Sequence, residues 1–128
     1  MQFKELFIFG KIVFDDFSSL YDTDKIQYAF YPKRRGLQKD DLLKLGLDEG
    51  MFYWRYSDYA LDIGFYGVDQ KVLKIELVEC NDWDDEYKAS MAWWKPLKSI
   101  TCKTKDDVTK AVTEMLEYVR KQTGVEKK

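Results

Sequence analysis

Apolar and polar side chains alternate with a period of two between residues 51 and 79, and this pattern limits the fold more than any other feature of the chain. A period of two places successive side chains on opposite faces of a β-strand. Ser57-Asp58 and residues 67–70 interrupt the alternation with residues that are typical of turns. We therefore expect a three-stranded antiparallel meander with one apolar face, formed by Phe52, Trp54, Leu61, Ile63, Phe65, Leu73, Ile75 and Leu77.

The segment from Thr104 to Gly124 has apolar residues at three- and four-residue spacing, which predicts an amphipathic helix. Thr104 is a suitable N-cap, and Asp107 can complete a capping box with it. Arg120 and Lys121 suit the negative end of the helix dipole, and Gly124 is a typical C-terminal stop. We expect the buried face of this helix to carry Val108, Ala111, Val112, Met115, Leu116 and Val119.

Residues 3–21 are ambiguous, because their apolar side chains fit both a helical period and a strand period. We predict a strand over residues 3–9 and a helical turn over 13–20. Elsewhere, alternation and leucine spacing predict a strand over 26–30, a short helix over 38–45 and a strand over 97–103.

These elements together predict an α+β fold. We expect an antiparallel sheet of about four to six strands, with a long C-terminal helix and one or two short helices packed on one face of it. A chain of 128 residues has the size of one domain, and no Gly/Ser-rich linker divides it. The expected organisation is a single domain over residues 1–124 and a frayed tail over 125–128.

Composition narrows the chemistry that the chain can perform. Histidine is absent, which removes the commonest general base, the commonest zinc ligand and every Ser–His or Cys–His nucleophile pair. Cys80 and Cys102 are too few for a disulfide framework, so we expect two reduced thiols at strand ends, with a disulfide as the alternative. No phosphate loop, GxSxG elbow, export signal or membrane-spanning stretch is visible. We expect a cytoplasmic protein with no catalytic, cofactor-binding or metal-binding residues.

The most unusual stretch of the chain is an acidic run, in which four carboxylates and a tryptophan occur within five residues. An EF-hand is excluded, because tyrosine follows where the calcium loop needs glycine. Carboxylates around an aromatic anchor are typical of protein interfaces, where charge steers association. A solvated turn would explain the same residues. We predict that the acidic run binds a partner through Asp82, Trp83, Asp84, Asp85 and Glu86.

Aromatic residues make up 16% of the chain, and the adjacent Trp93 and Trp94 would point to opposite faces of a strand, which leaves one of them exposed. We assign both to the partner-binding site, with packing in the core or at its rim as the alternative. Residues 37–94 contain 6 Lys and Arg against 13 Asp and Glu, a balance that repels nucleic acid and attracts a basic protein. Four tyrosines also fall outside the expected apolar faces: Tyr53, Tyr59, Tyr66 and Tyr87.

The aromatic segment 54–66, the acidic run, the Trp93-Trp94 pair and the capped C-terminal helix together resemble the small bacterial immunity proteins of contact-dependent growth inhibition and related systems. The resemblance is one of overall character, so the site residues rest on their own chemistry. It implies a protein that binds a cognate toxin domain, often a nuclease, and occludes its basic active-site cleft with acidic and aromatic side chains. The alternatives are a small enzyme that uses carboxylate or tyrosine acid–base chemistry and an adaptor domain of a larger assembly. An acidic run that lines a deep pocket would favour the enzyme.

Overall fold

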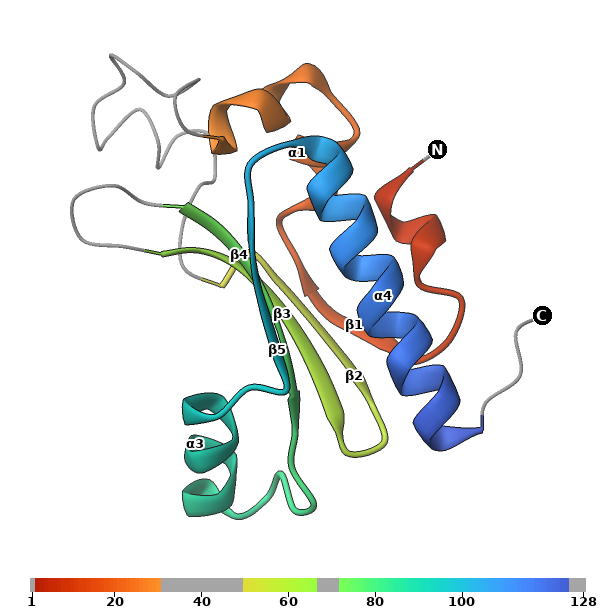
Figure 1. Cartoon of the computed structure of the whole chain (residues 1–128), viewed down its shortest axis with the longest axis vertical. Coiled ribbons are helices and arrows are strands. Elements are labelled where there is room, and N and C mark those ends of the chain that lie inside the picture. The colour runs from red at the N-terminus through yellow and green to blue at the C-terminus, as the bar shows by residue number, and fades with distance from the viewer. Residues whose placement is uncertain (1, 31–49, 67–71, 125–128) are drawn as a thin grey trace.

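The computed structural model of the chain describes residues 2–30, 50–66 and 72–124. Five strands form one antiparallel sheet in the order β1-β2-β3-β4-β5, and the long helix α4 crosses one face of it (Figure 1). The predicted α+β class is confirmed. The strands are β1 (Lys11–Asp15), β2 (Phe52–Tyr56), β3 (Tyr59–Tyr66), β4 (Val72–Glu79) and β5 (Lys98–Cys102).

Strands β2, β3 and β4 form the meander that the alternation predicts. Tyr56 of β2 lies opposite Tyr59 of β3, so that Ser57 and Asp58 make a two-residue turn between them. Ser57 has a φ of 53°, and a positive φ at this position matches the twist of the two strands that the turn connects. Every side chain that the sequence assigned to the apolar face is buried. The predicted strand before the C-terminal helix is confirmed as β5.

Helix α4 (Lys105–Thr123) is confirmed together with both of its caps. The Thr104 hydroxyl accepts a hydrogen bond from the Asp107 N–H at 3.1 Å. The Asp107 carboxylate accepts from the Lys103 N–H at 2.9 Å, and this bond holds the pKa of Asp107 below its usual range. Gly124 ends the helix with a φ of 73°. The six residues predicted for the inner face are all buried.

The predicted strand over residues 3–9 is wrong. Phe3–Leu6 form a 3-10 helix, η1, which begins with a capping box in which the Gln2 N–H donates to the Glu5 carboxylate at 3.2 Å. The first strand begins only after Gly10, which turns the chain with a φ of 75°. The predicted helical turn over 13–20 is right only at its end, because residues 13–15 belong to β1 and the helix α1 is Ser18–Tyr21.

The predicted strand over residues 26–30 is also wrong, since Asp24–Ala29 form a second 3-10 helix, η2. The Thr23 hydroxyl caps it by accepting from the Lys25 N–H at 3.3 Å. Ile26 and Ala29 are three residues apart, which places them one above the other on a 3-10 helix, and both are buried. The alternation of Ile26, Tyr28 and Phe30 did not predict the structure, because the buried pair of this helix is Ile26 and Ala29, at a spacing of three.

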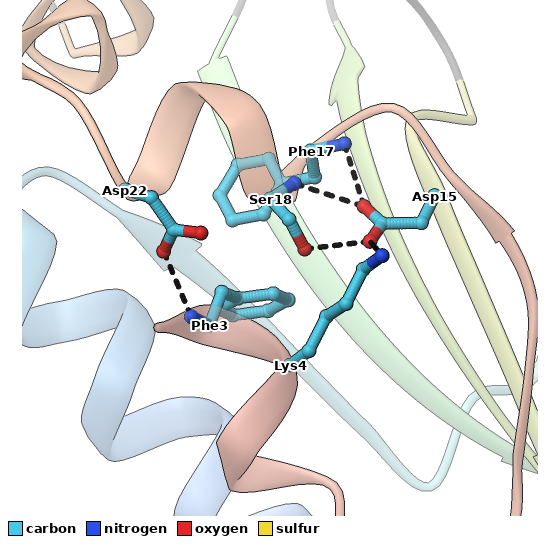
Figure 2. A network of polar contacts seen from close by, with 6 residues as sticks. All are labelled: Phe3, Lys4, Asp15, Phe17, Ser18 and Asp22. Atoms are coloured by element: carbon cyan, nitrogen blue, oxygen red, sulfur yellow. Dashed lines mark hydrogen bonds and ion pairs between the residues drawn. The ribbon is translucent and has the colours of Figure 1, made fainter. Parts of the chain in front are cut away.

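Two carboxylates hold this N-terminal segment together (Figure 2). Asp15 accepts hydrogen bonds from the N–H groups of Phe17 and Ser18 at 3.0 and 2.8 Å, and from the Ser18 hydroxyl at 2.6 Å. Asp22 accepts from the Phe3 N–H at 2.8 Å. These bonds satisfy backbone donors at the start of α1 and η1 that the short helices cannot satisfy themselves.

The sheet has two unlike faces. One face packs against α4, η1, α1 and η2 and holds the core, whereas the helix α3 (Glu86–Trp94), which the sequence did not predict, lies on the opposite side (Figure 1). The thiols of Cys80 and Cys102 are buried and free, as expected, and burial raises the pKa of Cys102 to about 12. None of the helices in the described ranges is long and apolar enough to cross a membrane. The predicted helix over 38–45, turn over 67–70 and tail over 125–128 lie outside the described residues.

Candidate protein-binding surface

The acidic run forms the connection between β4 and α3, and two of its carboxylates have local structural roles. Asp85 is the N-cap of α3 and accepts a hydrogen bond from the Lys88 N–H at 3.1 Å. Asp82 accepts from the Asp84 N–H at 3.2 Å and shapes the turn before the helix. Asp84 and Glu86 are exposed beside them. Asp84 and Glu86 are therefore the candidate binding carboxylates of the run.

Trp83, which the sequence suggested as an anchor for a partner, anchors the loop to the protein itself. Its indole N–H donates to the Asp58 carbonyl at 3.0 Å, in the turn between β2 and β3. The guanidinium carbon of Arg55 lies 4.5 Å from the centre of the Trp83 ring, a cation–π contact. The loop is therefore fixed on the sheet face that α4 leaves uncovered.

The two adjacent tryptophans have different surroundings. Trp93 is half-buried, and its ring centre lies 5.9 Å from that of Trp83 and 6.2 Å from that of Tyr53 on β2. Trp94 is 80% exposed. One of the pair is thus exposed, as expected, but the two side chains point in different directions because they lie on a helix and not on a strand. Trp93 attaches α3 to the sheet and leaves Trp94 on the outside.

An apolar stripe runs along the outer side of α3. Tyr87, Met91 and Trp94 follow one another at spacings of four and three residues, which places them on one side of a helix. They are 74%, 40% and 80% exposed, respectively. We call these three residues the α3 stripe. Sequence reasoning missed it because the helix itself was not predicted, although the spacing and the cap at Asp85 were the signals that could have found it.

A shallow hollow lies between the α3 stripe and the end of β4. Tyr87 and Met91 line it on the helix side, and Glu79 and Asn81 line it on the strand side. None of the four carboxylates of the acidic run lines this hollow. The hollow thus has the apolar side chains of Tyr87 and Met91 on one side and is also lined by the charged residues Glu79, Lys88 and Lys95.

Of the four tyrosines expected outside the core, only Tyr87 is exposed. Tyr59 is a correction, since it is 6% exposed and contacts Tyr118 of α4 with ring centres 6.2 Å apart. The reason is its position in β3. Tyr59 lies two residues before the buried Leu61, so both side chains point to the same face of the sheet. Burial, aided by the charge of Glu79, raises the pKa of Tyr59 to about 12.

A separate carboxylate pair lies on the face of the sheet that points away from α4. Asp62 and Glu76 are direct partners on β3 and β4, and the Tyr66 hydroxyl donates to Asp62 at 2.7 Å. Burial, aided by the charge of Glu76, raises the pKa of Asp62, while the bond from Tyr66 opposes that shift. The acidic run has no part in this cluster.

The candidate site thus comprises the α3 stripe and the exposed carboxylates of Asp84, in the loop before α3, and Glu86, its first residue. Trp83 attaches this loop to the sheet, and Trp93 attaches the helix. We compared the chain with protein-family models, with curated proteins and with solved structures. None of the three comparisons gave a match.

Proposed function

We propose that this protein is an immunity protein that binds a cognate toxin domain and occludes its basic active-site cleft. The observation that carries the proposal is the α3 stripe, in which two large aromatic side chains, Tyr87 and Trp94, are mostly exposed. Tryptophan and tyrosine contribute more binding energy at interfaces than most other residues, because they bury a large area at a small cost in conformational entropy.

The acidic side chains near α3 support a basic partner. Asp84 and Glu86 stand at the start of α3, and residues 37–94 carry an excess of acidic side chains. Lys88 lies in the first turn of α3 and Lys95 at its C-terminal end, so the N-terminal end combines four carboxylates of the acidic run with one lysine and is acidic overall. A cleft that binds phosphate groups is lined by lysine and arginine, and exposed carboxylates accelerate its association with this surface.

Attachment of α3 to the sheet supports a preorganised interface. The cap by Asp85, the indole bond of Trp83 and the ring contacts of Trp93 hold the helix without using the α3 stripe. A binding surface that is already ordered loses less conformational entropy on association. This arrangement is suited to the tight stoichiometric binding that neutralisation of a toxin needs.

The experiment begins with the tagged full chain as bait in a lysate of its source, and mass spectrometry identifies what co-purifies. That protein is then expressed alone and assayed for nuclease activity with increasing amounts of the chain. We expect activity to fall to zero at one equivalent. A partner whose activity is unchanged by the chain would contradict the proposal.

Two sets of variants then locate the interface. Trp94→Ala should weaken the complex at least 10-fold, whereas Val13→Ala, which removes an exposed apolar side chain from β1, should leave it unchanged. Asp84→Lys combined with Glu86→Lys should slow association about 10-fold at low salt and less at high salt. The matched charge control is Asp16→Lys combined with Asp24→Lys. Equal effects of test and control variants would remove α3 from the interface.

A further inference from the structure

The sheet ends in β1 and β5, each of which pairs on one side only within the described ranges. An edge strand presents backbone N–H and C=O groups that can pair with another strand. The two edges differ, because the pairing of β1 with β2 shifts register between Ile12 and Phe14, and a bulge of this kind hinders addition of a strand. The pairing of β5 with β4 runs in one register from Lys98 to Cys102. The β5 edge is therefore the one suited to accept a strand.

The side chains of β5 do not protect this edge. Proteins commonly block an edge with an outward-pointing lysine, a proline or a bulge. The only charged residue of β5 is Lys98, and its ammonium lies 5.7 Å from the centre of the Tyr118 ring on α4. Ser99 and Thr101 are exposed but small, and β5 contains no proline.

A hollow of about 200 Å³ lies beside the β5 edge, between this strand and α4. Its floor is apolar, with the half-buried Ile100 on the strand and Ala111 on the helix. Its rim is charged, with Asp107, Lys110 and Glu114 on α4. Alternate side chains of an added strand would point to the side of the sheet where this hollow lies.

We propose that the β5 edge binds an extended segment of a partner protein as an added strand, with an apolar side chain in the hollow and a basic side chain next to it. The basic residue is favoured because the side chains that line the hollow include two carboxylates, Asp107 and Glu114, and one ammonium, that of Lys110, while the Lys98 ammonium lies over the Tyr118 ring. A second copy of this chain fits less well, since a symmetric pairing presents the same negative rim to itself. This inference does not depend on the proposed function of α3.

A phage-displayed library of random seven-residue peptides, selected on the immobilised full chain, supplies the probe. We expect enriched peptides to alternate apolar and basic residues. Synthetic versions are then methylated at one backbone nitrogen at a time, and binding is measured by fluorescence polarisation. In an added antiparallel strand alternate N–H groups point toward β5, so methylation should weaken binding at least 10-fold at every second position and little at the positions between.

Variants of the chain then place the peptide. Glu114→Lys should weaken binding of the basic peptide about 10-fold, because it reverses an exposed charge on the rim. Glu86→Lys, a matched change on α3, should leave peptide binding unchanged while it slows association with the toxin. The two proposals can therefore fail separately.

Three results would overturn the inference. The first is a selection that enriches no peptide, and the second is a methylation scan without a period of two. The third is self-association of the chain that Glu114→Lys changes, measured by sedimentation at increasing concentration, since a second copy would then occupy the edge.

Discussion

Gly10 and Gly124 have almost the same backbone conformation, with φ values of 75° and 73°, but different surroundings. A Cβ atom on Gly10 would lie 2.6 Å from ring atoms of Trp54, whereas one on Gly124 would have no other atom within 4 Å. The Trp54 ring is fully buried and donates its N–H to the Phe9 carbonyl at 3.0 Å, so it cannot move without loss of that bond. Gly10 is therefore required for space as well as for conformation.

We expect Gly124→Ala to lower the free energy of unfolding by about 1 kcal/mol, the usual cost of a positive φ in alanine. Gly10→Ala should lower it by about 3 kcal/mol or more, because the clash with Trp54 is added. Urea denaturation of both variants measures the difference. Equal decreases in the free energy of unfolding would mean that the Trp54 ring moves aside at no cost.

Asp62 predicts a pH dependence of stability. Because burial raises its pKa in the folded protein, the folded state holds this proton more tightly than the unfolded chain does. Asp62 therefore lowers the free energy of unfolding as the pH rises from the ordinary carboxyl pKa through the raised value. Asp62→Asn, which keeps an oxygen acceptor for Tyr66, should be more stable than the parent at pH 7. This advantage should vanish at about pH 3, where the parent carboxyl is protonated in both states. Thermal unfolding at the two pH values tests the sign.

Single residues of the candidate site were only partly predictable from the sequence. The acidic run and the exposure of one adjacent tryptophan follow from local composition. The role of Trp83 does not, because its hydrogen-bond partner Asp58 is 25 residues away and is brought near only by the β2–β3 turn. Tyr59 could have been assigned to the buried face, since it precedes Leu61 by two residues in the alternating segment.

At the scale of elements, length decided what could be predicted. The meander and α4 repeat their periods several times, which makes the pattern unambiguous. The helices η1, α1 and η2 have 4, 4 and 6 residues, too few to separate a helical period from alternation. Side chains outside these helices, above all Asp15 and Asp22, satisfy their first N–H groups, and such partners are set by the tertiary fold.

Asp15→Ala tests how much these bonds stabilise the N-terminal segment. The variant loses three hydrogen bonds, one of them from the buried Ser18 hydroxyl, and should lower the free energy of unfolding by about 2–3 kcal/mol. Asp22→Ala loses one bond and should cost about 1 kcal/mol. Replacement of the exposed neighbour Asp16 by alanine is the control, and denaturation midpoints give the order. A loss at Asp15 no larger than that at Asp16 would contradict the role of the network.

In the whole molecule, the core lies on one face of the sheet and the proposed binding surface lies on the other. Val112 of α4 lies fully buried in the core on one face, and Trp93 is half-buried against the other. Val112→Asp places an unpaired charge in that core and should unfold the chain, at a cost of about 4 kcal/mol or more, whereas Thr113→Asp on the exposed side of α4 should not.

Trp93→Ala should lower the free energy of unfolding by only about 1–2 kcal/mol, because the core on the α4 side is untouched. The same change should increase hydrogen exchange in α3, since the ring contacts that attach this helix are lost. Global unfolding by Trp93→Ala would mean that α3 belongs to the cooperative core.

The strand order also has a consequence for how the chain folds. Every strand pairs with its neighbour in sequence, and β2 to β5 lie within a continuous stretch of about 50 residues, so each connection among them is shorter than the one between β1 and β2. The pairing of β1 with β2 closes the longest loop between adjacent strands and loses the most chain entropy. We expect β2 to β5 to assemble in the transition state and the N-terminal segment to dock afterwards. Asp15→Ala should then accelerate unfolding and leave the refolding rate nearly unchanged.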